Sequence, residues 1–155
     1  MRKLLLSCLV VSAVALVAAS ALAQQKPSFT PGLGEFMLQT QTRHLKLWLA
    51  GNAGNWELAD YEIDELKEGL EDAAKYVPSY KGTPVGPMIE STIMKPIEEV
   101  EAAIRARDRG KFTTAFDKLS AACNTCHTAA NRAFIVVQRP TGVQFPNQAF
   151  APRPQ

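Results

Sequence analysis

Cysteine is scarce in this chain of 155 residues, which has three, and no block of basic residues stands out in a formal net charge of +2. Three cysteines argue against a disulfide scaffold, and the lack of a basic block gives nucleic-acid binding little support. We find no convincing strand pattern and no internal repeat. Hydrophobic residues nevertheless make up 46% and charged residues 21%, so we expect one helical domain with a packed core.

Residues 1–23 have the pattern of a cleaved secretory signal peptide. Arg2 and Lys3 form a basic start, an apolar stretch follows over about 4–17, and small residues at 21–23 make a cleavage site. The apolar run is short for a spanning helix, so a retained membrane anchor is the weaker interpretation. We therefore expect a periplasmic protein that is not membrane-spanning after cleavage. Cleavage would remove Arg2 and Lys3 from the 17 basic residues. The mature chain would then have 15 basic and 15 acidic residues and be close to neutral.

Glycine and proline divide the remaining chain into a flexible lead-in over 24–32, a helical region over 33–138 and an extended, proline-rich tail over 139–155. Apolar residues recur at three- and four-residue steps in four stretches of the helical region, at about 33–50, 56–76, 89–104 and 111–136. Four amphipathic helices with short connections predict an all-α fold, an antiparallel four-helix bundle.

Three local features of this pattern make specific structural predictions. Asn55 is a good N-cap for the second helix. Pro96 falls inside the third apolar stripe, so we expect either a kinked helix or one that restarts with Pro96 in its first turn. In the tail, we expect Phe145 and Phe150 to hold the chain against the bundle.

Cys123, Cys126 and His127 form a C-x-x-C-H run, the pattern of a c-type haem attachment site. Two thiols that add to the two vinyl groups of one haem must lie close together, and the next residue must bring an imidazole under the iron. Residues three and four apart share one face of a helix, so all three side chains meet this need. The sequence therefore predicts one covalently attached haem c with His127 as the proximal iron ligand.

Two other kinds of C-x-x-C site fit this chain less well. A thioredoxin-like pair would sit where a strand meets a helix, and no such strand is indicated. A structural zinc site needs four ligands, and after loss of Cys8 with the signal peptide the chain offers the three motif residues and His44. Export also favours haem, because such attachment is usual outside the cytoplasm.

With these residues in view, the chain resembles the class II c-type cytochromes, the cytochrome c′ group. The resemblance extends over about 33–134, and its local matches are Thr114-Ala115-Phe116, Ala121-Ala122-Cys123 and Cys126-His127, with a weaker one in Glu35-Phe36-Met37. It implies a four-helix bundle, thioether bonds at both motif cysteines and a proximal histidine. The chain departs from the family in its long tail, in Arg43-His44 and in Trp48, so it resembles a divergent branch, and the resemblance does not define its distal pocket.

Met37 and His44 are the two residues of the first helix that could approach the iron from the side opposite His127. We take the first and fourth helices as antiparallel neighbours, with the end of the first near Ala50 beside the start of the fourth near Lys111. Counting the same number of residues along both helices then places His127 at the same height along the bundle, or level, as Gly34. Met37 is then roughly 5 Å and His44 roughly 15 Å from that level. This estimate favours Met37, or an open sixth position, over His44, whose alternative role is a core histidine with a hydrogen-bond partner.

Arg132 lies five residues after His127 and is a candidate contact for a haem propionate, with a solvated surface arginine as the simpler alternative. We expect periplasmic electron transfer to a redox partner protein, because axial methionine suits that role. The alternative is a five-coordinate haem that binds or senses a small gas such as NO or CO. We do not expect an enzyme, since His44 is the one candidate for distal acid–base work. A homodimer stays open, although no apolar stripe is left over for it.

Overall fold

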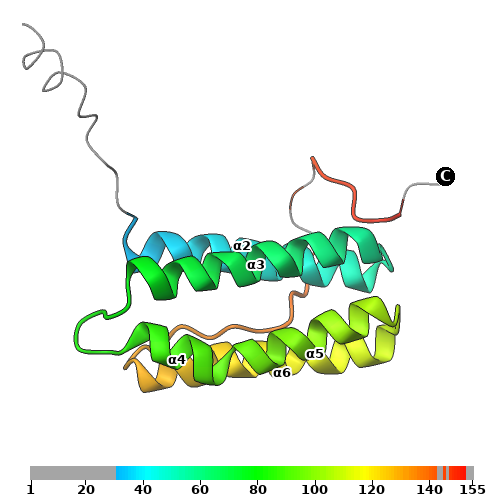
Figure 1. Ribbon diagram of the computed structural model, residues 1–155. Coiled ribbons are helices and arrows are strands. Elements are labelled where there is room, and N and C mark those ends of the chain that lie inside the picture. Colours follow the sequence, from blue (N-terminus) through cyan, green and yellow to red (C-terminus); the bar gives the residue numbers. More distant parts are fainter. Residues whose placement is uncertain (1–30, 143–144, 146, 153–155) are drawn as a thin grey trace, which may run out of the picture. The chain divides into compact units, whose positions relative to one another are not determined.

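The computed structural model describes residues 31–142, 145 and 147–152, and every structural statement below concerns these residues. The expected signal peptide, most of the lead-in and parts of the tail lie outside them. The described chain is all-helical, as predicted, with no named strand (Figure 1). Its helices are α2 (Leu33–Asn52), α3 (Trp56–Tyr76), α4 (Val85–Thr92), α5 (Met94–Arg105) and α6 (Arg109–Ala129).

Side-chain caps fix the start of two helices. The Asn55 carboxamide oxygen accepts a hydrogen bond from the Leu58 N–H at the start of α3, as its position in the sequence predicted. Asp108 does the same for the Lys111 N–H at the start of α6, at 3.0 Å. Each bond satisfies one of the N–H groups that have no acceptor inside the first turn of a helix.

Pro96 explains why the structure has five helices where four apolar stretches were counted. α4 ends at Thr92 and α5 restarts at Met94, so Pro96 occupies the first turn of the new helix. A proline is tolerated there because the N–H that it lacks would have no intrahelical acceptor. In a continuous helix the same ring would clash with the carbonyl of Thr92. The restart, one of the two expected outcomes, is confirmed.

The apolar stripes of the helices meet in one core. α2 packs on α3, α5 packs on α6, and α4 contacts both α3 and α6. The side chains with 1% exposure or less include Leu47, Ile63, Ile97, Phe112, Phe116 and Leu119. No helix in the described ranges is both long enough and apolar enough to cross a bilayer.

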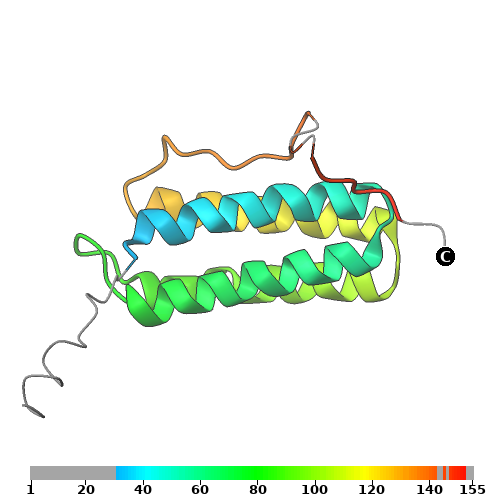
Figure 2. The same ribbon diagram turned by 90° about the horizontal axis from the view of Figure 1, so that it is seen from above.

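After α6 the chain runs back alongside α2 and α6, drawn from orange to red in Figure 2. Phe150 is buried, and Phe145 packs against the core with the Lys46 ammonium 5.1 Å from its ring centre. Arg139 forms an ion pair with Asp117 on α6. The prediction that the two phenylalanines hold the tail against the helices is confirmed.

Candidate functional site

The C-x-x-C-H residues lie in the last two turns of α6. Cys123 and Cys126 are free thiols, partly buried and packed against the apolar core. Burial raises the pKa of the Cys123 thiol to about 12, and burial likewise raises the pKa of Cys126. At neutral pH both sulfurs are therefore protonated, in an apolar setting one helical turn apart.

α6 ends sooner than the sequence predicted. The apolar residues near 134–136 suggested a helix reaching Val136, but the last helical residue is Ala129. Asn131 takes a positive φ of 57°, its N–H bonds the Thr128 carbonyl at 3.1 Å, and the next N–H bonds the His127 carbonyl at 2.7 Å. This is a Schellman ending, and it turns the chain back over the motif.

The returning chain, residues 132–137, is called the strap below, and it orients His127. The Nδ1 atom of His127 lies 2.9 Å from the carbonyl oxygen of Ile135 in the strap. A carbonyl can only accept, so Nδ1 carries the proton in a neutral imidazole and the lone pair is on Nε2. Histidines that bind a metal are commonly held in this way through their second nitrogen.

Asn124, one of the two variable residues of the motif, clamps the strap. Its amide nitrogen donates to the Val137 carbonyl at 2.8 Å, and the Val137 N–H donates to its amide oxygen at 2.7 Å. One side chain thus satisfies both polar groups of one backbone residue. No sequence pattern indicates this role, which depends on the chain reversal after α6.

α4 flanks the motif from the other side. The Cys126 sulfur lies 3.9 Å from the carbonyl oxygen of Met88, and the Thr92 side chain acts to lower the pKa of the same thiol, against the larger effect of burial. Both residues are partly buried. They were not among the predicted site residues, although their four-residue spacing places them on one face of a helix.

Two contacts fix the register between α2 and α6. Arg109 at the start of α6 donates to the side chain of Asn52 at the end of α2 at 2.9 Å, and His44 Nε2 lies 2.9 Å from Ser120 Oγ. The residue numbers rise in one helix as they fall in the other, so the helices run in opposite directions. His127 lies seven residues after Ser120 on α6, and Met37 lies seven residues before His44 on α2. Each step covers roughly 10 Å along its helix axis, in the same direction.

Counted from the second contact, Met37 is level with His127; counted from the first, that level falls at Gly34, the residue estimated from the sequence. Met37 therefore lies within about one turn of the level of His127. Its side chain is partly buried and packs against the core. His44 lies two turns away from that level. The two candidates for the distal side of the iron are thus well separated along α2.

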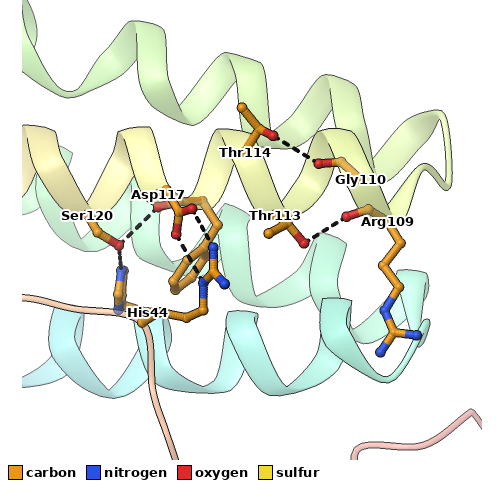
Figure 3. Close-up of polar contacts among 9 residues, drawn as sticks. His44, Arg109, Gly110, Thr113, Thr114, Asp117 and Ser120 are labelled. Atoms are coloured by element: carbon orange, nitrogen blue, oxygen red, sulfur yellow. Dashed lines mark hydrogen bonds and ion pairs between the residues drawn. The ribbon is translucent and has the colours of Figure 1, made fainter.

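His44 has the surroundings of a core histidine. It is 5% exposed, and its ring centre lies 4.3 Å from that of Phe116. Ser120 donates its one hydroxyl proton to the Phe116 carbonyl at 3.0 Å, so His44 Nε2 donates to Ser120 (Figure 3). Burial lowers the pKa of His44 to about 4. The histidine is neutral near pH 7, and the alternative expected for it, a hydrogen-bonded core residue, is confirmed.

Arg132 follows the Schellman ending and is partly exposed. Its guanidinium donates to the carbonyl of Asn131 at 3.0 Å. The propionate contact stays a prediction.

A separate hollow of about 810 Å³ lies by the α2–α3 turn. Trp56, Tyr61 and Arg107 line it together with residues 147–149, 151 and 152 of the tail. None of the predicted site residues borders this hollow. The chemistry of the motif therefore does not extend to it.

The donor set at the end of α6 fits a covalently attached haem. Two unpaired thiols lie one turn apart, and the adjoining imidazole has one nitrogen occupied and one available. Within the described ranges, no three His, Cys, Asp or Glu side chains are gathered as ligands of a metal ion. Comparison with protein-family models, with curated proteins and with solved structures finds no match. The interpretation of the site rests on its own residues.

Proposed function

We propose that this chain is an exported monohaem c-type cytochrome that transfers electrons in the periplasm. The observation that carries the proposal is the hydrogen bond between His127 Nδ1 and the Ile135 carbonyl, at 2.9 Å. It leaves Nε2 as the available nitrogen, beside two free thiols on the same helix. Haem bound there would supply a one-electron redox change at its iron.

In this proposal each residue has a defined task. Cys123 and Cys126 form the thioether bonds, His127 is the proximal ligand and Met37 is the distal one. Met37 lies within about one turn of the level of His127 on the antiparallel helix α2, which supports the last assignment, and axial methionine raises the potential of a haem. His44 keeps its bond to Ser120, which argues against a role at the iron.

We also propose a finer architecture. As the resemblance to class II c-type cytochromes implies, α4 and α5 act together as the third helix of an antiparallel four-helix bundle. The proline-rich tail, in which the chain departs from that family, follows the seam between α2 and α6. The pairings of α2 with α3 and of α5 with α6 support this arrangement.

The first test asks whether haem is attached covalently. The full chain is produced in a host with haem-maturation machinery, and haem is measured on a denaturing gel and by its pyridine complex. We expect one haem per chain in the wild type and none that resists denaturation in a Cys123→Ala, Cys126→Ala double variant. A wild-type protein without covalent haem would contradict the proposal.

The second test identifies the distal ligand with matched controls. Apart from Met1, the chain has three methionines, Met37, Met88 and Met94, all partly buried. We expect the ferric wild type to show a methionine-to-iron charge-transfer band that only Met37→Ala removes. Loss of the band in Met88→Ala instead would move the ligand to α4. A high-spin wild type that shifts with carbon monoxide would favour the gas-binding alternative.

A further inference from the structure

The strap that holds His127 has little burial to keep it in place. Phe134 is 78%, Ile135 47% and Val136 69% exposed. Exposed apolar side chains contribute almost nothing to holding a loop, because they remain in water after folding. The position of the Ile135 carbonyl must therefore depend on the polar contacts at the ends of the strap.

Those contacts lie at two points. At the start, the Schellman ending at Asn131 fixes the direction in which the chain leaves α6. At the end, Asn124 bonds both the N–H and the carbonyl of Val137, at 2.7 and 2.8 Å. Ile135 lies between these points, two residues from the clamp, and its own N–H bonds the Arg132 carbonyl at 2.8 Å.

We infer that Asn124 is a positioning residue for the proximal ligand: through Val137 it holds the Ile135 carbonyl on His127 Nδ1. The inference rests on the proposed function and goes beyond it by assigning a task to a variable residue of the motif. The bond to the carbonyl keeps the proton on Nδ1 and makes Nε2 a stronger electron donor. Stronger donation favours the oxidised iron, so the clamp lowers the reduction potential.

The test compares three variants of the holoprotein. Asn124→Ala removes both hydrogen bonds of the clamp, and Asn124→Leu removes them while keeping a side chain of similar size. Ile135→Ala is the matched control, because it trims an exposed side chain of the strap and leaves the carbonyl in place. Hydrogen exchange of the Val137 amide and the reduction potential are measured for each.

We expect the Val137 amide to exchange at least tenfold faster in both Asn124 variants and their potentials to be more positive than that of the wild type. Ile135→Ala should match the wild type in both measurements. A loss of packing alone would not raise the exchange rate of the Val137 amide and the reduction potential together in both Asn124 variants.

Unchanged potentials in both Asn124 variants would overturn the inference and leave the proposed function standing. An equal rise in Ile135→Ala would also overturn it, because that result would trace the effect to the side chain and not to the carbonyl. Absence of covalent haem from the wild type is read separately on the denaturing gel, and it would overturn the proposed function and this inference together.

Discussion

α2 and α6 run side by side, and their two ends are built differently. The closed end, defined by His44, Trp48, Gly51, Phe112 and Phe116, is buried, with the Trp48 ring centre 5.0 Å from that of Phe116. The open end, defined by Met37, Cys123, Cys126 and His127, is only partly buried. A hydrogen-bonded strap covers it in place of packed rings.

The comparison separates the residues that stabilise the fold from those that are proposed to hold haem. At the closed end the polar group is His44, and Ser120 satisfies it. Throughout the described chain, no buried side-chain nitrogen or oxygen lacks a hydrogen-bond partner. At the open end two thiols and one imidazole nitrogen remain available. Changes at the closed end should therefore alter stability, and changes at the open end should alter the site.

The largest expected effect comes from deleting an aromatic ring at the closed end. Phe112 is 0% exposed, and a Cβ added at Gly51 would lie 2.2 Å from its ring. Removing a ring from so tight a space leaves a cavity, so Phe112→Ala should lower the free energy of unfolding by about 3–5 kcal/mol. Denaturant unfolding of the holoprotein measures this.

Phe134→Ala in the strap is the matched control for that substitution. The Phe134 ring is 78% exposed, so its removal should change the free energy of unfolding by less than about 0.5 kcal/mol. If Phe112→Ala and Phe134→Ala lost similar amounts of unfolding free energy, the closed end and the strap would not differ in stability as their burial indicates.

Much of the helical framework and the motif could be predicted from the sequence, because their signals are local. Periodic apolar residues gave α2 and α3 to within two residues, Asn55 marked the start of α3, and Pro96 marked the break between α4 and α5. The motif likewise identified Cys123 and His127 as the centre of the candidate site. These predictions needed only spacing and the special backbone properties of a few residues.

The end of α6 and the contacts between distant segments could not be predicted, because they depend on residues brought together by the fold. The apolar run over 134–136 continued a helical pattern, and the left-handed conformation of Asn131 ended the helix before it. The clamp joins Asn124 to a residue 13 positions away, and the contact between His44 and Ser120 spans 76. No local pattern reports either pairing.

His44 makes the closed end sensitive to acid. Its pKa is about 4 in the folded protein and near 6.5 in the unfolded chain. Below pH 6.5 the unfolded chain takes up a proton that the folded protein does not, so the free energy of unfolding falls as the pH drops from 6.5 to 4. The full loss is about 3 kcal/mol.

His44→Gln isolates this contribution, because glutamine does not titrate and its amide N–H can still donate to Ser120. The wild type should lose more stability than the variant between pH 6.5 and 4, as measured by denaturant unfolding at each pH. Parallel curves for the two proteins would mean that His44 is already protonated, or already exposed, in the folded state.

The smallest expected effect lies between the two ends, where the tail crosses α6. Arg139 pairs with Asp117, with its Nε 3.1 Å from Oδ1, and its guanidinium lies 4.8 Å from the centre of the Trp48 ring (Figure 3 shows Asp117). Both charged side chains are about half exposed, at 43% and 51%, so solvent and salt screen the pair. Asp117→Asn should therefore lower the free energy of unfolding by less than about 1 kcal/mol, and by less still at high salt.

Arg139→Ala also loses the contact with Trp48, so it should lower the free energy of unfolding more than Asp117→Asn does, and the difference should persist at high salt. Equal costs at every salt concentration would mean that the tail is held here by charge alone.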